Sequence, residues 1–475
     1  MCKYCILYLE ILKKEGQNMI PERFKEKMKE VLGEEYPSFI KALEEHDAVR
    51  GMRVNLLKTT PDKLIADGEF KLEPIEYVSN GFILREERAM GASPYHHAGM
   101  VYMQDPGAMA SAAALDIEPD WWVADLCAAP GGKSSQIAER LGEGGFILSN
   151  EYVPKRAKII VGNLERLGVR NAIVTSLDTA KIKDMYEGVF DLVVVDAPCS
   201  GEGMFRKSEE AVSDWSDENV RICAERQAEI INNARGLVKA GGYLLYSTCT
   251  YSPEENEGVI GAFLRANPDY RLVKVKDSLI ERTSPAIARY ADGVENIEYA
   301  RRFYPHVSDG EGQFLALMQR DEGVDARERI LYKDEGKPLS KQESAAVSAF
   351  FKEALTKAPS GRVVKVGENI ALVSHDCPIP KGSVFMSGVL LGEIKGSTFC
   401  PHHQFFSAYG DLFKYRENLE KGDTRVEKYL AGEEIETKEG AKGWCAILFE
   451  GAPLGGGKAS GGRIKNHYPK GLRTR

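Results

Sequence analysis

The sequence has few cysteines, no excess of basic charge and no long apolar run. Its nine cysteines in 475 residues are scattered and odd in number, so they do not form the dense framework of a small secreted protein. This usage indicates a reducing cytoplasm. With 63 Lys and Arg against 71 Asp and Glu, the net charge of −8 excludes a surface coated with basic residues. Any contact with nucleic acid must therefore come from local patches.

The rest of the composition is that of a globular protein. Hydrophobic residues make up 43% and charged residues 28% of the chain, which excludes collagen, wholesale disorder and a membrane protein. A chain of 475 residues is expected to form about two to four domains.

The first residues carry a short apolar run, CILYLEIL (5–12). Glu10 interrupts it and no small-residue cleavage site follows, so it does not read as a signal peptide. Cys2 and Cys5 have the spacing of half a zinc site, but no second pair completes it, and no metal is expected. A helical pattern begins after Met19, so residues 1–18 are predicted to be an extension without a structural role.

From about residue 120 the chain alternates strand-like and helix-like segments, which predicts an α/β domain with a mostly parallel sheet. Seven strands are expected, at 121–125, 146–151, 172–176, 191–196, 243–249, 271–275 and 313–318. Helices are expected at 134–141, 155–167, 217–238 and 253–265. Gly241-Gly242 is interpreted as the stop signal of the third helix.

Composition shifts divide the rest of the chain. The segment 321–345 is charged and poor in large apolar residues, as a linker is, whereas short Val, Leu and Ile strands punctuated by Gly and Pro follow it. We therefore expect a mixed N-terminal region, the α/β domain, a linker and a β-rich domain, at 19–99, 100–320, 321–345 and 346–475.

A glycine-rich turn follows the first strand of the α/β domain. It consists of Cys127, Ala128, Ala129, Pro130, Gly131, Gly132 and Lys133. Between a strand and a helix, such a turn lets backbone N–H groups approach a ligand closely. It is not a P-loop, because Cys127 stands where that pattern requires glycine, and the dinucleotide pattern G-x-G-x-x-G is absent.

Four carboxylates fall at or just beyond the ends of successive strands: Asp125, Glu151, Asp178 and Asp196. In an open parallel sheet these ends line one crevice, and Glu151 stands about where an acid binds ribose hydroxyls in nucleoside-binding folds. Carboxylates repel a polyphosphate, so S-adenosylmethionine, with its sulfonium and ammonium charges, suits this field better. For any single aspartate the alternative is a turn or cap residue.

Cys199 and Cys249 close the fourth and fifth strands, so both thiols are expected to open into the same crevice. A buried cysteine is usually an inert small hydrophobe. That interpretation is preferred for the cysteines placed elsewhere, which are Cys223, Cys377, Cys400 and Cys445.

These motifs resemble the RNA 5-methylcytosine methyltransferases of the Nol/Nop/Sun type, and within them the bacterial ribosomal small-subunit methyltransferase F group. The resemblance runs through Gln104-Asp105-Pro106, DLCAAPGGKS (125–134), Asn150-Glu151, DAPCSGEG (196–203), YSTCTYSPEENE (246–257) and GEGQF (310–314). The combination of PCSG with STCT is highly specific. The closing segment KNHYPK (465–470) resembles the end of the PUA-like domain of the F group.

The resemblance implies a Rossmann-like, seven-stranded methyltransferase domain between an N-terminal RNA-binding region and a C-terminal PUA-like RNA-binding domain. S-adenosylmethionine would lie along residues 127–133, with Glu151 on the ribose hydroxyls, Asp178 near the adenine amino group and Asp196 also at the cofactor. Cys249 would add to cytosine C6 as the nucleophile, Asp196 would bind the N3 edge, and Cys199 would assist product release. DNA cytosine methyltransferases use the cysteine at the position of Cys199 as nucleophile, so the assignment between the thiols rests on the resemblance.

The implied substrate is RNA, namely the 16S rRNA of the small ribosomal subunit or the assembled 30S subunit. Transfer RNA is the nearer alternative, and an RNA-binding ribosome-assembly factor with incidental methylation is the alternative from another class. No DNA or membrane partner is expected, and the protein is expected to be a cytoplasmic monomer.

Local basic patches are the candidates for RNA contacts. Arg206 and Lys207 stand next to the PCSGEG motif, and Lys465 and Lys470 lie in a basic tail where Tyr468 is interleaved. A second basic set around the N-terminal strand consists of Arg50, Arg53 and Lys58. The alternative interpretation of this set is a solvated surface that binds no RNA.

Overall fold

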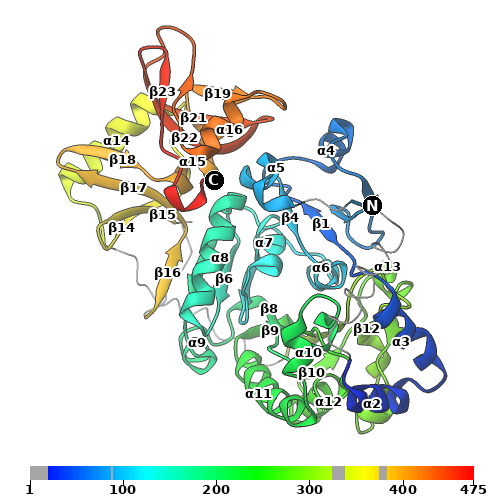
Figure 1. Ribbon diagram of the computed structural model, residues 1–475. Helices are drawn as coiled ribbons and strands as arrows, with labels where there is room; N and C mark the ends of the chain where they lie inside the picture. The colour runs from blue at the N-terminus through cyan, green and yellow to red at the C-terminus, as the bar shows by residue number, and fades with distance from the viewer. Residues whose placement is uncertain (1–19, 87–88, 324–336, 374–381, 475) are drawn as a thin grey trace, which may run out of the picture.

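The computed structural model describes residues 20–86, 89–323, 337–373 and 382–474. Figure 1 shows three parts: N-terminal helices and a small sheet in blue, a central α/β domain in cyan and green, and a C-terminal β-rich part in yellow to red. Residues 1–18, with Cys2 and Cys5, lie outside the described residues. In the described part of the chain, no helix combines the length and apolarity needed to cross a membrane.

The central sheet confirms the Rossmann-like fold. Five parallel strands have the order β7-β6-β5-β8-β9, and the antiparallel β13 lies beside β9 and pairs with β10. These seven are β5 (Trp122–Asp125), β6 (Phe146–Asn150), β7 (Ala172–Thr175), β8 (Phe190–Asp196), β9 (Val238–Thr248), β10 (Tyr270–Leu272) and β13 (Gln313–Arg320). The sequence did not predict three further strands of this sheet: β11 (Ser284–Pro285), β12 (Arg301–Phe303) and β16 (Val384–Ser387).

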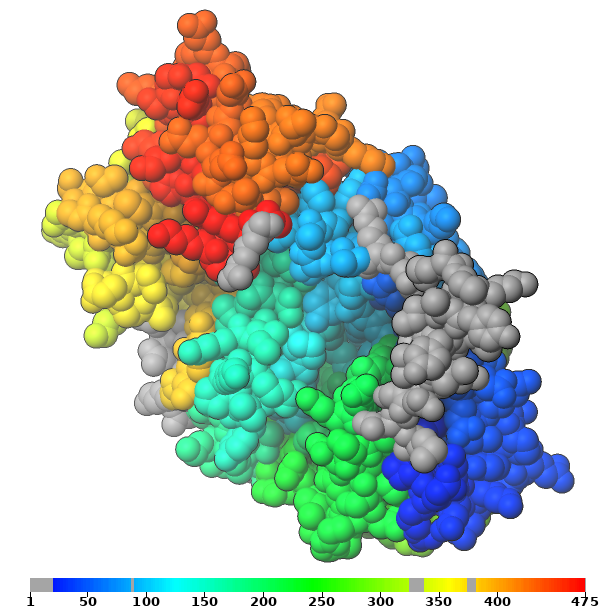
Figure 2. All heavy atoms as spheres, viewed as in Figure 1, coloured from blue at the N-terminus to red at the C-terminus, as the bar shows by residue number. Residues whose placement is uncertain are grey.

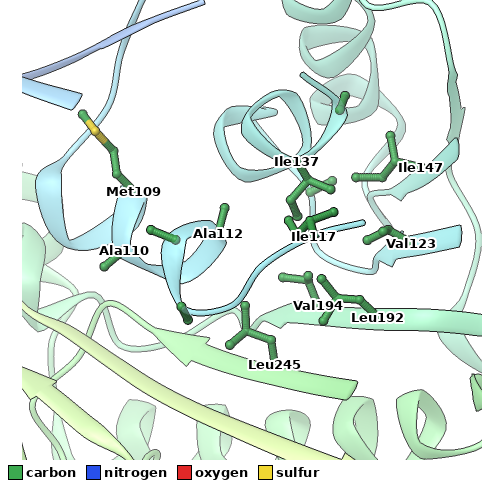
Figure 3. Close-up of a cluster of buried hydrophobic side chains, with 14 of the residues drawn as sticks. Met109, Ala110, Ala112, Ile117, Val123, Ile137, Ile147, Leu192, Val194 and Leu245 are labelled. Carbon is green, nitrogen blue, oxygen red and sulfur yellow. The ribbon is translucent and has the colours of Figure 1, made fainter. Parts of the chain in front are cut away.

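Helices cover both faces of this sheet. They include α7 (Gly132–Ala138), α8 (Pro154–Leu167), α9 (Thr179–Met185), α11 (Asp217–Arg235) and α12 (Glu257–Ala266). On one face, Val123, Leu192 and Leu245 from the strands pack with Ile137 of α7, as Figure 3 shows, and the same cluster includes Met109 of α6 (Pro106–Ala113). The chain order of the parallel strands reverses at β5, and ligands of such sheets bind outside the strand ends at this point.

One helix boundary differs from the prediction. The helix α11 ends at Arg235, and Gly241-Gly242 lie inside β9 instead of stopping the helix. Gly241 has φ +73°, and the pairing of β8 with β9 is irregular between Phe190 and Leu192. The glycines therefore permit a local irregularity early in β9, because glycine adopts positive φ without a steric penalty.

The N-terminal part packs against loops of the central α/β domain. The helices α2 (Glu22–Leu32) and α3 (Tyr36–Glu45) lie beside α10 (Glu209–Ser213) and α12 in Figure 1. Phe24 meets Trp215 edge-to-face with ring centroids 5.6 Å apart, and Phe39 meets Tyr251 at 5.0 Å. An antiparallel sheet of order β2-β3-β1-β4 follows, formed by β1 (Gly51–Val54), β2 (Leu72–Pro74), β3 (Gly81–Leu84) and β4 (Val101–Met103).

The C-terminal part holds two sheets. The first has the order β14-β15-β17-β18, with β14 (Arg362–Val366), β15 (Asn369–Val373), β17 (Val389–Lys395) and β18 (Thr398–Pro401). The second has the order β19-β21-β22-β23-β20, with β19 (Arg416–Leu419), β20 (Ile435–Glu436), β21 (Gly443–Phe449), β22 (Ala452–Ser460) and β23 (Arg463–Asn466). The α-helices of the C-terminal part are α14 (Lys341–Ala354), α15 (His403–Tyr409) and α16 (Arg425–Ala431).

The C-terminal part contacts both other parts (Figure 2). Its strand β16 pairs antiparallel with β7 and extends the central sheet. Lys58, from the loop after β1, donates to the carbonyl of Pro453 at 2.9 Å, and burial lowers the pKa of its amine to about 7. His97 and Tyr468 share a hydrogen bond of 2.8 Å between the ring nitrogen Nδ1 and the phenol oxygen.

A buried ion pair ties β12 to α12. The Arg302 Nε donates to Glu257 Oε1 at 2.6 Å and its Nη1 donates to the carbonyl of Tyr251 at 2.8 Å, with the Arg302 side chain 2% exposed and that of Glu257 fully buried. The pair thus fixes both the start of α12 and the loop before it.

We expect Arg302→Met to lower the free energy of unfolding by about 3–5 kcal/mol, because it leaves the Glu257 carboxylate buried without its partner. Arg271→Met is the matched control, since Arg271 pairs with Asp321 on the surface and such pairs contribute about 0–1 kcal/mol. Urea unfolding of the variants measures both effects. Equal losses for the two variants would contradict the assignment.

Candidate active site

The two predicted thiols meet. Cys199 follows β8 and Cys249 follows β9, which run parallel with Asp196 opposite Ser247. The two Sγ atoms lie 3.2 Å apart, and both residues are partly exposed. The hydrogen bond with Cys249, followed by burial, raises the pKa of the Cys199 thiol well above its usual value.

Asp196, the last residue of β8, is held from two sides. Lys133 Nζ lies 2.7 Å from Asp196 Oδ2, and Ser247 Oγ donates to Oδ1 at 2.7 Å. The Lys133 side chain is 8% exposed and that of Asp196 is 32% exposed. The cation of the glycine-rich turn is thus paired with Asp196, a contact that the sequence did not indicate.

Asp125 does not line the crevice as expected. It is fully buried beneath the turn, where Ser134 Oγ donates to its Oδ2 at 2.6 Å. Burial raises the pKa of its carboxyl to about 7. Gly131 in the turn above has φ +107°, a conformation that favours glycine.

Glu151 and Asp178 lie at the next strand ends. Glu151 is nearly buried; its Oε1 accepts from the backbone N–H of Val153 at 3.0 Å, and Arg156 Nη1 lies 3.3 Å from its Oε2. Asp178 is exposed and caps α9, since its side chain accepts from the N–H of Ala180. Tyr152, which sequence reasoning did not single out, directly follows Glu151 and is 70% exposed.

The two loops that carry the thiols are joined by buried carboxylates that the sequence reasoning also missed. Glu202 and Glu255 are both fully buried, and both contact the hydroxyl of Thr250, which follows Cys249 and lies 2.7 Å from Glu202 Oε2 and 3.3 Å from Glu255 Oε1. Their signal in the sequence was an acid in each of the two cysteine motifs.

The basic pair beside the thiols corrects the prediction for Arg206. Its side chain is 6% exposed and its Nε donates to Glu311 Oε2 at 2.6 Å, so it serves the protein interior and not RNA. The Lys207 side chain is 25% exposed and pairs with Asp105 at 2.8 Å. By contrast, Lys465 and Lys470 are exposed.

Of three other residues considered for RNA contacts, Arg53 and Tyr468 are buried and Lys58 is partly buried. Arg53 is fully buried and pairs with Glu139 at 2.7 Å, and Lys58 lies in the junction described above. Tyr468 is 2% exposed and belongs to the core. Pairing and packing across the chain explain all three, because long cationic side chains enter the interior only with such partners.

The remaining cysteines are separate from the thiol pair. Cys223 and Cys445 are buried, Cys400 is partly buried, and Cys377 lies outside the described residues. Across the described ranges, no group of three or more His, Cys, Asp or Glu residues could hold a metal ion.

Comparison with known proteins identifies the family. Family models match three consecutive segments: the N-terminal domain of 16S rRNA methyltransferase RsmF at residues 20–106, 16S rRNA methyltransferase RsmB/F at 112–319, and the methyltransferase RsmF PUA domain at 416–474. The ribosomal RNA small subunit methyltransferase F of Erwinia tasmaniensis is 31% identical over 95% of this chain and 96% of its own length. The chain belongs to the ribosomal RNA small subunit methyltransferase F family.

Other relatives agree with this membership. The F methyltransferase of Vibrio vulnificus is 30% identical over 95% of this chain and 97% of its own. A solved methyltransferase homolog protein from Pyrococcus horikoshii is 31% identical with a TM-score of 0.53, covering 61% of this chain and 92% of that one. The resemblance noted in the sequence, the Rossmann-like fold and the PUA domain are therefore confirmed, and by family this chain is an rRNA methyltransferase.

Proposed function

We propose that this member of the F family methylates C5 of cytosine in small-subunit ribosomal RNA through a covalent bond between Cys249 Sγ and cytosine C6. The observation that carries the proposal is the contact of two thiols 3.2 Å apart, at the ends of adjacent strands, beside Asp196. Cytosine C5 is a poor nucleophile, and addition of a thiolate at C6 makes it enamine-like.

The assignment of Cys249 as the nucleophile rests on the resemblance of its STCT motif to that of the family. With the two sulfurs 3.2 Å apart, the S–H of Cys199 can donate a hydrogen bond to the Cys249 sulfur when that sulfur is ionised. Asp196 bonds the N3 edge of the cytosine as the adduct forms. After transfer, C5 loses a proton and the Cys249 sulfur leaves, and Cys199 assists this release.

The site fits S-adenosylmethionine better than a phosphate ligand. Its turn offers small residues and backbone, and its one cation, Lys133, is already paired with Asp196. Glu151 and Asp178 add acceptors for hydroxyl and amino groups, and exposed Tyr152 offers a face for the adenine. When bound, the cofactor supplies the electrophilic methyl group, and the turn 127–133 orients it towards the thiols.

The second C-terminal sheet supplies an RNA-binding face. Trp444 on β21 is paired with Lys458 on β22, which is paired with Lys465 on β23, so the three side chains share one face. Lys458 Nζ lies 5.7 Å from the centre of the Trp444 ring. Exposed cations interleaved with an aromatic ring suit single-stranded nucleic acid, and Lys470 extends the same basic tail.

We expect the double variant Lys458→Ala/Lys465→Ala to weaken RNA binding uniformly across sequences. Each lost phosphate contact lowers the slope of log affinity against log salt by roughly 0.7 on single strands. Filter binding at several salt concentrations measures the slope. The control is Lys352→Ala, an exposed lysine of α14 outside this face, and the same slope in all three proteins would remove these lysines from the RNA interface.

The proposed reaction is tested with labelled S-adenosylmethionine and three unmodified substrates: assembled small subunits, naked small-subunit rRNA and bulk transfer RNA. Bisulfite mapping then locates the modified base. We expect label at a small-subunit cytosine. Label confined to transfer RNA would keep the chemistry and overturn the substrate, and label at a base other than cytosine would overturn the chemistry.

A further inference from the structure

Each of the two loops that carry the thiols also carries a buried carboxylate, and each carboxylate is hydrogen-bonded by groups of the other loop. Glu202 stands three residues after Cys199, yet three of its four hydrogen-bond donors lie on the Cys249 loop, and the fourth is Trp215 Nε1. Its Oε2 accepts from Thr250 Oγ1 at 2.7 Å and from the backbone N–H of Tyr251 at 2.8 Å. Its Oε1 accepts from Ser252 Oγ at 2.5 Å.

Glu255 makes the converse connection. It belongs to the Cys249 loop, and its Oε2 accepts from the backbone N–H of Ser200, the residue after Cys199, at 3.0 Å. Its Oε1 accepts from Ser200 Oγ at 2.5 Å and lies 3.3 Å from Thr250 Oγ1. Gln227 of α11 donates to Oε2 at 2.7 Å.

The hydroxyls between these carboxylates join the loops directly. Ser200 Oγ and Thr250 Oγ1 lie 2.8 Å apart, and each belongs to the residue that follows a thiol. The backbone N–H of Gly203 also donates to the carbonyl of Cys249 at 2.9 Å. Both carboxylates are fully buried, so solvent does not compete for these bonds.

We propose that Glu202 and Glu255 are positioning residues that hold the Cys199 and Cys249 sulfurs in contact through these reciprocal bonds. Neither carboxylate reaches the substrate in this arrangement; each acts through the residue that follows a thiol. The consequence for the reaction rests on the proposed function: a sulfur pair held in contact keeps the release group beside the adduct. The positioning itself is independent of it.

The donors around the two carboxylates predict different responses to an amide. At Glu255, Oε1 meets only the hydroxyls of Ser200 and Thr250, which can accept as well as donate, so Glu255→Gln can keep every contact. At Glu202, each oxygen receives an N–H that can only donate. These come from the Tyr251 backbone on Oε2 and from Trp215 Nε1 on Oε1, at 2.8 Å each. Glu202→Gln must therefore set its amide N–H₂ against a donor.

The test measures how readily the two sulfurs join. Diamide oxidises two thiols to a disulfide and takes up both hydrogens on its own nitrogens, and the rate depends on the sulfurs meeting. Peptide mapping by mass spectrometry follows the Cys199–Cys249 cross-link in the full-length protein without RNA or cofactor. The result therefore stands whether or not the methylation proposal survives.

We expect the native protein and Glu255→Gln to cross-link at similar rates, and Glu202→Gln and Glu255→Ala to be roughly tenfold slower, because loosened loops bring the sulfurs together less often. Replacing Trp215 by phenylalanine removes one obligate donor, so Glu202→Gln/Trp215→Phe should recover part of the rate.

Thr250→Val provides a second test of the same bonds in case the glutamate variants do not fold. It keeps the side-chain shape and removes the one hydroxyl that contacts both carboxylates, so we expect an intermediate rate. Circular dichroism and thermal unfolding identify the folded variants. Native cross-linking rates in folded Thr250→Val together with folded Glu255→Ala or Glu202→Gln would overturn the proposal, as would a Glu255→Gln rate as low as that of Glu255→Ala.

Discussion

Cys199→Ala is expected to leave the enzyme covalently attached to its RNA, whereas Cys249→Ala abolishes both methylation and attachment. The reason is the division of roles between two sulfurs 3.2 Å apart. Cys249 forms the bond to C6, and without Cys199 the methylated adduct is released slowly. Loss of the nucleophile should lower the methylation rate by at least about 10³-fold, as for other covalent catalysts.

A denaturing gel with substrate RNA and S-adenosylmethionine measures attachment as a shifted band. The double variant Cys199→Ala/Cys249→Ala should give no band, and Cys223→Ala, a change at a buried cysteine of α11, should behave as the native enzyme. A shifted band with Cys249→Ala instead would exchange the roles of the two thiols. Absence of a band in every variant would count against the covalent scheme.

The sequence predicted the parallel strands well because they lie in the interior. A strand covered on both faces is an apolar run, as at 191–196, and the ends of such runs placed both thiols at one edge. The strand β12 was missed because two of its three residues are arginines, and Arg302 is buried only through Glu257. The strand β16 was missed because it joins the sheet from the C-terminal part.

The partners of the site residues were harder to predict than their positions. Arg206 looked like an RNA contact because its local sequence is basic, but Glu311, more than a hundred residues later, pairs with it. Lys133 looked like part of the cofactor turn, but its side chain ends at Asp196. In both cases the charge and the position were readable, whereas the direction of the side chain depends on contacts between distant segments.

The contact of Lys133 with Asp196 predicts a second large effect. Lys133→Met removes the cation 2.7 Å from Asp196 Oδ2, so the carboxylate loses the charged partner that fixes its orientation. We expect kcat to fall roughly 10²-fold at neutral pH, the size typical of a lost electrostatic contact in an active site.

The matched control is Lys155→Met, an exposed lysine of α8. Methylation rates measured over a range of S-adenosylmethionine concentrations separate the two roles open to Lys133. A fall in kcat with an unchanged KM for the cofactor assigns Lys133 to Asp196 and the base. A raised KM for S-adenosylmethionine with unchanged kcat would show that Lys133 acts in binding the cofactor and not through Asp196. Because the two residues act as one unit, Lys133→Met/Asp196→Asn should be little slower than Asp196→Asn alone, whereas independent residues would lose activity additively in free energy.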